Sequence, residues 1–450
     1  MSGPAPEPGR GSLRERGTAL RDRLKGSSLA RGTWSMLLGY GCRSLVQTAY
    51  FVLIARALAP DGYGAFVGVV ALAGVLVPFA SWGTGQLLIQ DVARDPGQFA
   101  KRWGNALVVT TVSGLLLCAA VLGASRWMLP ASISIWLVVT VAVSELVFAR
   151  LTDIASQAFW AFGRLKRTAA ISVWMVVARL AAALVMLAVV PSPTPVAWGV
   201  GFLASSAFAA VLALVLVYRE LGAPDFAGAG MPRIREGFYF SVGQSAGGIY
   251  SEIDKTMLAR LATLQAAGAY GAAYRILDVA VAPLLSLLIA SYTQFFRSGT
   301  AGVSGTVRFA KRLLPIATGY GAVVGVGLWL CAPLIPYLLG EGYADTVGAL
   351  RWLALLPVLR AVQFLGADTL TGAGKQAARS ALYVIVAVVN VGLNFWLIPL
   401  YSWRGAAWAS LVSDGLLALL VWCVVLWLYR AERGAAAQAG PVFVAPAEAR

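Results

Sequence analysis

Long apolar runs alternate with short polar segments along almost the whole chain. Each run holds about 20 residues, the length that an α-helix needs to cross the hydrocarbon core of a bilayer. Because lipid offers no hydrogen-bond partners to an open backbone, the runs are predicted to be helices. They lie at 33–58, 65–89, 103–124, 132–158, 168–190, 196–218, 237–261, 268–292, 312–331, 347–370, 380–398 and 405–429. The pattern predicts an all-α polytopic membrane protein with about 12 transmembrane helices.

The composition supports this interpretation. Hydrophobic residues make up 59% of the chain and charged residues 12%, whereas a soluble domain carries about 25% charged residues. The connections between the predicted spans are short, so no separate soluble domain is expected. The first apolar run is too long for the hydrophobic region of a cleaved signal peptide, and it is predicted to remain as the first helix.

Arginine and lysine residues are distributed unevenly between alternate loops. If the N-terminus is cytoplasmic, roughly 25 of them fall on the cytoplasmic side and about 5 on the other, a strong positive-inside bias. The basic residues on the other side are Arg56, Arg126, Arg260, Arg351 and Arg404. The bias predicts an even number of spans with both termini in the cytoplasm. It also accounts for the formal charge of +16 without a nucleic-acid partner.

No residue pattern indicates a metal site or a cofactor. The chain contains no histidine, which excludes histidine-based metal sites and histidine general bases. Its four cysteines, Cys42, Cys118, Cys331 and Cys423, fall in four different apolar runs without metal-binding or redox spacing. We therefore expect neither a metal nor a cofactor, and interpret these cysteines as small buried side chains.

The second half of the chain weakly repeats the first. Arg56 and Arg260, Tyr63 and Tyr270, Gly163 and Gly372, and Pro191 and Pro399 are each separated by a nearly constant interval of about 200 residues. Six spans precede the second copy, so both copies have the same orientation, as in parallel-repeat transporters. The predicted units are a cytoplasmic tail at 1–32, a six-helix lobe at 33–218, a linker at 219–236, a second six-helix lobe at 237–430 and a cytoplasmic tail at 431–450. The first tail is expected to be disordered or an amphipathic helix on membrane lipids.

Ionisable residues inside the spans are the main functional clue. Each would cost about 2.5–3.5 kcal/mol at the bilayer centre, so such residues face a bundle interior or a watery cavity. Three pairs at i,i+3 spacing could neutralise themselves on one helix face: Arg150 with Asp153, Glu252 with Lys255, and Arg275 with Asp278.

Three arginines near mid-span have no acidic residue three or four positions away: Arg43, Arg179 and Arg360. A guanidinium cannot lose its proton, so each needs an anion, water or an acid on another helix. We expect them to form, with Lys255 and Arg275, a cationic cavity for an anionic substrate; salt bridges between helices are the alternative. The guanidinium geometry suits phosphate oxygens, so a phosphate or pyrophosphate group is the predicted ligand.

Coupling of transport to protons or sodium would require a buried acid. Glu145 is the preferred candidate because it has no basic residue at i±3 or i±4, and Asp278 is a second candidate.

Several segments together resemble Wzx-type oligosaccharide flippases of the multidrug/oligosaccharidyl-lipid/polysaccharide exporter superfamily. They are Ala55–Gly64 (ARALAPDGYG), Asp254–Arg275, Gly340–Tyr343, Val389–Pro399 and Gly405–Ala407. The resemblance covers roughly residues 25–430, and its order and spacing are more specific than any single motif. One departure is Ala59, where the family commonly has glycine. We expect it to matter little because Gly62 and Gly64 would supply the turn.

The resemblance implies two six-helix lobes around a central cavity, as in multidrug exporters. It also implies a function: moving polyprenyl-pyrophosphate-linked oligosaccharides across the bacterial inner membrane, for O-antigen, capsule or exopolysaccharide synthesis. A polysaccharide polymerase and export machinery would be further partners. The cationic cavity expected from the residues suits such a pyrophosphate.

Three other functions fit the sequence less well. A multidrug-exporter-type antiporter for organic cations would favour an acidic cavity. A lipid II flippase resembles fourteen-span proteins, and no further apolar run follows Arg430. A membrane enzyme, such as a glycan polymerase or glycosyltransferase, would carry a large soluble loop with acidic catalytic residues; the chain has no such loop and no Asp-x-Asp in a connection. The prediction is therefore a transporter rather than an enzyme.

Overall fold

The computed structural model describes residues 28–227, 241, 251–300 and 302–438; within the described helices, the side chains of 28–43, 289, 290, 293 and 435–438 are not described. In this part of the chain the regular elements are helices and no strand occurs. The predicted tails therefore lie mostly outside the described residues, as do the end of the predicted linker and the first part of the predicted seventh span. The all-α fold expected from the apolar runs is confirmed.

The described residues of the first half of the chain form seven helices. They are α2 (Ser28–Ala80), α3 (Thr84–Arg94), α4 (Phe99–Met128), α5 (Ile135–Val143), α6 (Ala149–Ala161), α7 (Leu165–Val189) and α8 (Pro195–Leu221). A short 3-10 turn, η1 (Pro96–Gln98), precedes α4, and a π-helical turn, η2 (Ser144–Phe148), joins α5 to α6. Ser134 and Thr194 accept hydrogen bonds from backbone N–H groups at the starts of α5 and α8, as N-cap residues do.

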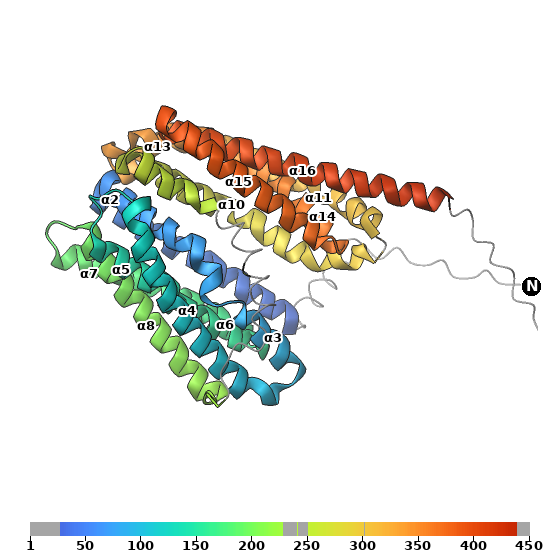
Figure 1. The fold of residues 1–450 in the computed structure, drawn as a ribbon, viewed down its shortest axis with the longest axis horizontal. Helices are drawn as coiled ribbons and strands as arrows, with labels where there is room; N and C mark the ends of the chain where they lie inside the picture. Colours follow the sequence, from blue (N-terminus) through green and yellow to red (C-terminus); the bar gives the residue numbers. More distant parts are fainter. Residues whose placement is uncertain (1–27, 228–240, 242–250, 301, 439–450) are drawn as a thin grey trace, which may run out of the picture.

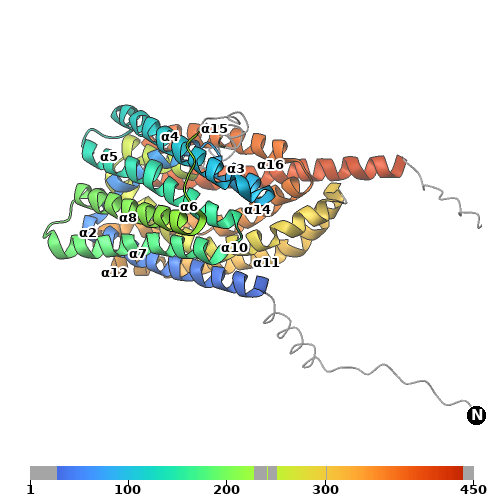
Figure 2. The ribbon, with the colours of Figure 1, turned by 90° about the horizontal axis from the view of Figure 1, so that it is seen from below.

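The described residues of the second half form six longer helices after the helical residues 251–261. They are α10 (Leu264–Gly299), α11 (Gly302–Cys331), α13 (Ala344–Leu353), α14 (Leu356–Gly372), α15 (Gln376–Tyr401) and α16 (Trp403–Gln438). The short elements η3 (Ala332–Leu334), α12 (Ile335–Leu339) and η4 (Glu341–Tyr343) connect α11 to α13. The last turns of α16 project beyond the other helices, so this helix continues past the predicted start of the C-terminal tail (Figures 1 and 2).

Helix α2 contains a sharp turn at Ala59. Its backbone angles there, φ 55° and ψ 173°, are non-helical. The rings of Phe51 and Tyr63 lie 5.7 Å apart, whereas twelve residues of straight helix would separate them by about 18 Å. The chain therefore turns back at Ala59, close to where the first predicted span ends. Gly62 and Gly64 are not in the left-handed region, so the expectation that they supply the turn is wrong.

The helices form two bundles, one from α2–α8 and the other from residues 251–438 (Figure 1). We call the end where α2 begins and α16 ends the tail end, and the end where α2 turns at Ala59 the turn end. Helix α2 makes the main contacts with the second bundle, chiefly with α10. The two bundles correspond to the two lobes expected from the sequence, although the predicted lobe boundaries remain predictions.

Among the described residues, nine helical stretches are long and apolar enough to cross a membrane, or ten if the pair Glu341–Leu353 and Leu356–Gly372, bent by 44°, forms one span. The stretch Ser44–Arg94 counts once although the chain turns back within it, and the predicted seventh span is only partly described. The chain is thus a multi-pass membrane protein, and its total of twelve spans remains a prediction. The predicted second span at 65–89 is interrupted at 81–83, between α2 and α3.

Glycines allow the two bundles to touch backbone to backbone at the turn end. A Cβ atom added to Gly64 would lie 1.9 Å from the carbonyl oxygen of Leu264, and one added to Gly268 would lie 2.0 Å from that of Pro60. The hydroxyl of Tyr343 donates a 2.7 Å hydrogen bond to the carbonyl oxygen of Ala55 beside them. We call these contacts the glycine seam. It closes the space between the bundles at the turn end.

Candidate functional site

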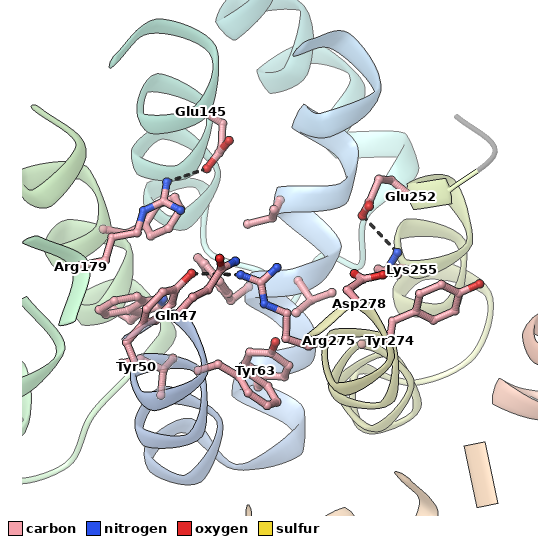
Figure 3. Close-up of a pocket in the computed structure, with 18 residues that line it drawn as sticks. Gln47, Tyr50, Tyr63, Glu145, Arg179, Glu252, Lys255, Tyr274, Arg275 and Asp278 are labelled. Atoms are coloured by element: carbon pink, nitrogen blue, oxygen red, sulfur yellow. Dashed lines mark hydrogen bonds and ion pairs between the residues drawn. The ribbon is translucent and has the colours of Figure 1, made fainter. Parts of the chain in front are cut away.

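A cavity of about 280 Å³ lies between the two bundles, next to the glycine seam (Figure 3). Both limbs of α2, the π-helical turn η2, α7 and α8 line it from one side, and residues 251–261 and α10 line it from the other. Its lining residues are Gln47, Tyr50, Phe51, Ile54, Tyr63, Phe66, Val67, Val70, Glu145, Arg179, Trp198, Phe202, Glu252, Lys255, Gly271, Tyr274, Arg275 and Asp278.

On the first bundle, Arg179 of α7 pairs with Glu145 of η2. The guanidinium Nη2 lies 3.0 Å from the carboxylate Oε1, and both side chains are largely buried. A π-helical turn carries one extra residue per turn and is often found at functional sites. Here the hydroxyl of Ser144 fixes η2 against α8 by a 2.8 Å hydrogen bond with Ser206. The Arg179 guanidinium also lies 4.1 Å from the ring centre of Phe202, a cation–π contact.

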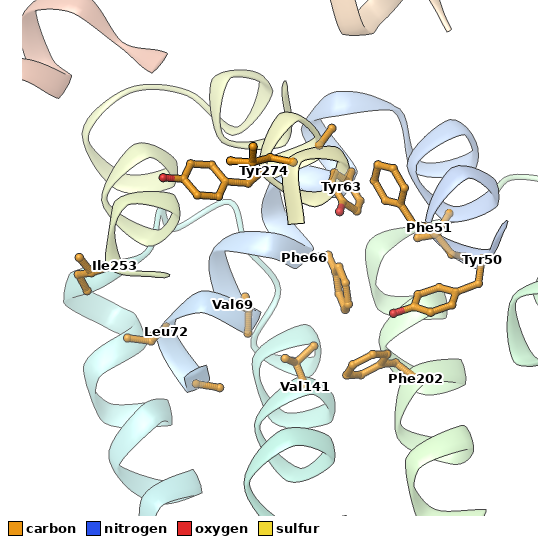
Figure 4. Packing of buried hydrophobic residues seen from close by; sticks show 14 of the residues in the cluster. Tyr50, Phe51, Tyr63, Phe66, Val69, Leu72, Val141, Phe202, Ile253 and Tyr274 are labelled. Atoms are coloured by element: carbon orange, nitrogen blue, oxygen red, sulfur yellow. The ribbon is translucent and has the colours of Figure 1, made fainter. Parts of the chain in front are cut away.

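Aromatic rings form the wall of the cavity on the first bundle (Figure 4). Phe66 contacts Phe202 with ring centres 5.2 Å apart and Trp198 at 6.1 Å. Tyr50 contacts Trp198 at 6.3 Å. This packing joins α2 to α8 and fixes the tyrosine hydroxyl of α2 in the cavity wall. The wall therefore combines apolar ring faces with polar groups.

On the second bundle, Lys255 is buried and surrounded by acceptors. Its Nζ lies 3.1 Å from Oε2 of Glu252 and 3.6 Å from Oδ1 of Asp254. It also donates to the carbonyl oxygen of Ser251 at 2.7 Å and lies 4.5 Å from the ring centre of Tyr274. The predicted i,i+3 pair of Glu252 with Lys255 is confirmed, and so is that of Arg150 with Asp153, at 2.6 Å.

Arg275 of α10 differs from the other basic residues in the cavity. Its Nη2 donates a 3.2 Å hydrogen bond to the hydroxyl of Tyr50 (Figure 3). The amide oxygen of Gln47 accepts from the same guanidinium when the amide is oriented for that contact. Both partners are neutral. Among the described residues Arg275 forms no ion pair.

The predicted pair of Arg275 with Asp278 is therefore not formed. Asp278 instead pairs with Arg360 of α14, at 3.4 Å between Nη1 and Oδ1. The Arg360 guanidinium also lies 5.7 Å from the ring centre of Tyr274. An ion pair between helices thus replaces the one expected within α10 and leaves Arg275 with neutral partners.

The structure brings most of the candidate residues together. Arg179, Lys255, Arg275, Glu145 and Asp278 all line the cavity. Arg360 adjoins it through Asp278, whereas the side chain of Arg43 lies outside the described part of the chain. The described lining contains three basic and three acidic side chains, so its formal charges balance. Arg275 is the basic group whose charge is least compensated.

A second polar cluster is buried inside the second bundle, beside the cavity. The carboxylate of Asp254, 1% exposed, accepts a 2.7 Å hydrogen bond from the hydroxyl of Tyr270 and a 3.4 Å one from Ser410 of α16. Asn390 of α15 donates to Ser413 of α16 at 3.0 Å. These hydrogen bonds join α10, α15 and α16 to residues 251–261.

Sequence analysis did not identify Gln47, Tyr50 or Tyr274 as site residues. Gln47 and Tyr50 lie at i,i+3 spacing and therefore share one face of α2. Polar and aromatic residues on one face of an apolar span indicate only weakly that this face lines a functional site. Their contact with Arg275, more than 200 residues away in sequence, could only come from the structure.

Comparisons with known proteins agree with the fold. A multidrug resistance MATE family transporter of the MOP superfamily in an inward-facing conformation has a TM-score of 0.71 and 16% identity, covering 90% of this chain and 100% of its own. The lipid II flippase MurJ in an inward closed conformation has a TM-score of 0.71 and 12% identity, covering 87% of each chain. An outward-facing MATE structure has a TM-score of 0.59 and 17% identity, covering 90% of this chain and 98% of its own.

At these identities the solved structures establish the fold only. No curated protein is significantly similar to the chain in sequence. The model of a family described as polysaccharide biosynthesis protein matches residues 29–295, more than half of the chain. The chain therefore belongs to the polysaccharide biosynthesis protein family and has the multidrug-exporter-like fold of MOP superfamily transporters.

Proposed function

We propose that the protein flips a polyprenyl-pyrophosphate-linked oligosaccharide across the bacterial plasma membrane. Membership of a polysaccharide biosynthesis family and the transporter fold support this activity. The observation that carries the proposal is Arg275, whose guanidinium faces a cavity between the lobes with two neutral partners. The glycan itself could belong to O-antigen, capsule or exopolysaccharide.

The chemistry of Arg275 suits a pyrophosphate. A guanidinium stays charged at all physiological pH values and presents paired N–H donors that match phosphate oxygens. Neutral partners hold the side chain in place without cancelling its charge. A pyrophosphate entering the cavity would therefore gain a charge-assisted contact without first breaking an ion pair of Arg275.

The other basic residues would join in only after an exchange of partners. Arg179, Lys255 and Arg360 each pair with a carboxylate in this conformation. A proton or another cation that neutralised Glu145 or Asp278 would free Arg179 or Arg360 for the substrate. We propose this exchange as the link between ion coupling and transport. Arg43 would complete the basic set from the first span.

The glycine seam supports an inward-facing state in this proposal. The seam separates the cavity from the turn end, and the TM-score is higher against the inward-facing than the outward-facing MATE structure. With both termini cytoplasmic, substrate would enter from the inner leaflet. Rocking of the lobes would then open the seam and deliver the glycan to polymerase and export machinery outside.

Deletion of the gene tests this function. The expected result is loss of surface glycan together with accumulation of lipid-linked repeat units on the cytoplasmic face. Complementation with Arg275→Gln is expected to fail, whereas Arg312→Gln, which removes an exposed arginine from α11 outside the cavity, is expected to restore the glycan. Deletion without accumulation of intermediates would contradict the flippase assignment.

An antiporter for organic cations is the second candidate. The carboxylates of Glu145, Glu252 and Asp278 in the cavity lining favour it, although each pairs with a basic side chain. Increased sensitivity of the deletion strain to cationic drugs, with normal surface glycan, would select this function. A lipid II flippase is the nearer alternative, and deletion would then impair cell-wall synthesis.

A further inference from the structure

A recess of about 320 Å³ lies on the second bundle at the tail end, away from the transport cavity. The first turns of α11 and the last turns of α16 form its walls. Its lining residues are Ser304, Val307, Arg308, Lys311, Tyr429, Glu432 and Arg433. The volume falls within the range of small-ligand sites, about 300–1,000 Å³. Within the described chain, three of the seven lining residues are basic.

The basic groups lie close together because they occupy the facing sides of α11 and α16. Ser304, Arg308 and Lys311 share one face of α11, because four and seven residues correspond to one and two helical turns. Tyr429 and Arg433 lie one turn apart on α16, with the guanidinium 4.9 Å from the tyrosine ring centre. The recess is therefore a basic groove between two helices.

The one acidic residue of the lining is already engaged. Glu432 accepts hydrogen bonds from the backbone N–H groups of Val303 at 2.8 Å and Ser304 at 3.0 Å. Gly302, at φ +72°, permits this contact, since a Cβ there would lie 2.7 Å from a carboxylate oxygen of Glu432. Glu432 thus fastens α16 to the start of α11. Arg308, Lys311 and Arg433 form no ion pair with the described residues.

The recess lies at the edge of the lipid-facing surface. Leu426 and Trp427 of α16 and Ile316 of α11 are exposed apolar side chains one to two turns closer to the middle of the bundle. Basic residues one turn beyond such a belt fall at the level of the lipid head groups. In the orientation proposed above, this level belongs to the cytoplasmic leaflet, where anionic lipids attract basic segments.

We propose that Arg308, Lys311 and Arg433 bind the phosphate of an anionic phospholipid head group of the cytoplasmic leaflet. The site is separate from the transport cavity and does not depend on the identity of the transported glycan. The lipid phosphate would lie between the two helices, and its acyl chains would run along the apolar belt of Leu426, Trp427 and Ile316. Bound lipid would hold α16 to α11 in addition to Glu432.

The test titrates the purified full chain in neutral detergent with dioctanoyl phosphatidylglycerol, with bound lipid counted by native mass spectrometry. Dioctanoyl phosphatidylcholine and inorganic phosphate are the comparison ligands. We expect Arg308→Gln/Lys311→Gln/Arg433→Gln to weaken phosphatidylglycerol binding about tenfold or more, because several charge-assisted phosphate contacts are lost. Single Arg433→Gln should weaken it less and serves as the variant least liable to misfold.

The matched control is Lys101→Gln/Arg219→Gln/Lys375→Gln, which removes the same charge from exposed positions outside the recess. This control should leave phosphatidylglycerol binding unchanged. An equal loss in the matched control, or no loss in either recess variant, would overturn the recess as the site. Competition by inorganic phosphate as strong as that of the lipid, or equal binding of phosphatidylcholine, would overturn the anionic lipid as its ligand.

Discussion

Ala59 shows how a single residue can carry strain in this fold. Its backbone angles fall in a region that is essentially restricted to glycine, and the resemblance to Wzx-type flippases also implies glycine at this position. The sequence predicts that Gly62 and Gly64 supply the turn and that the departure therefore matters little. In the structure the turn of α2 lies at Ala59 itself, so this alanine carries the backbone strain of the turn.

Replacement of Ala59 by glycine should therefore stabilise the protein. We expect Ala59→Gly to raise the free energy of unfolding by about 1 kcal/mol, because the relief of strain exceeds the entropy that glycine adds to the unfolded chain. Ala181→Gly, on the exposed face of straight α7, is the control and should lower it by about 1 kcal/mol. Thermal unfolding in detergent measures the stability change of both variants. A lower midpoint for Ala59→Gly would contradict the strain.

The buried carboxylate of Asp254 gives a second prediction for a single residue. Tyr270→Phe removes the 2.7 Å hydrogen bond that its hydroxyl donates to this carboxylate. The expected cost is about 1.5–3 kcal/mol, the range for hydrogen bonds to charged groups. Tyr274→Phe is the matched control, since the two rings touch at 4.9 Å and Tyr274 makes no such bond to Asp254. Equal thermal midpoints for the two variants would rule out this role of Tyr270.

At the scale of helices, the glycine seam explains why close contact between the lobes needs particular residues. Gly64 and Gly268 face carbonyl oxygens of the opposite lobe at distances that leave no room for a side chain. Backbone contact of this kind lets two helices meet and part without unlocking interdigitated side chains. We expect this to make the turn end an outer gate.

Gly268→Ala should prevent closure of this gate, because its Cβ would lie 2.0 Å from the Pro60 carbonyl oxygen. Spin labels at Ser192 and Glu341, in a background with the cysteines replaced by serine, report the distance across the turn end. The distribution should shift to longer distances in Gly268→Ala and stay unchanged in Gly319→Ala, where a Cβ meets open space. A distribution unaffected by Gly268→Ala would exclude the seam as a gate.

Helix positions followed from the sequence more closely than the contacts between helices. Apolar runs located most spans within a few residues, because hydrocarbon thickness sets their length. The break between α2 and α3 and the π-helical turn at Glu145 were not predicted, since both depend on packing. Ion pairs within one helix were predicted correctly at Arg150 and Lys255. At Arg275 the prediction was wrong, because Arg360 on another helix lies closer to Asp278.

At the scale of the whole molecule, the distribution of basic residues predicts the orientation. Both termini should be cytoplasmic, because the loops at the tail end carry most of the arginine and lysine. A green fluorescent protein fused after Arg450 should fluoresce, and alkaline phosphatase fused at Ser192, at the turn end, should be active. The opposite pattern at both sites would reverse the proposed direction of transport.

The two-lobed architecture relates the seam, the cavity and Arg275 to one another. The seam closes one end of the molecule, the cavity lies directly behind it, and Arg275 reaches this cavity from α10, the helix that also carries Gly268. Opening the seam would therefore move the proposed phosphate-binding residue with the gate. Substrate binding and access would then be coupled through one helix.

The most direct test reconstitutes the protein in liposomes with a fluorescent polyprenyl-pyrophosphate oligosaccharide and measures how fast the label becomes accessible to an impermeant reagent from the other leaflet. The wild-type protein and Arg312→Gln should exchange the lipid between leaflets at similar rates. Arg275→Gln should slow this exchange at least about tenfold, because the guanidinium that meets the pyrophosphate, the least compensated basic group of the cavity, is lost. Exchange by Arg275→Gln at the wild-type rate would contradict the proposed role of the cavity.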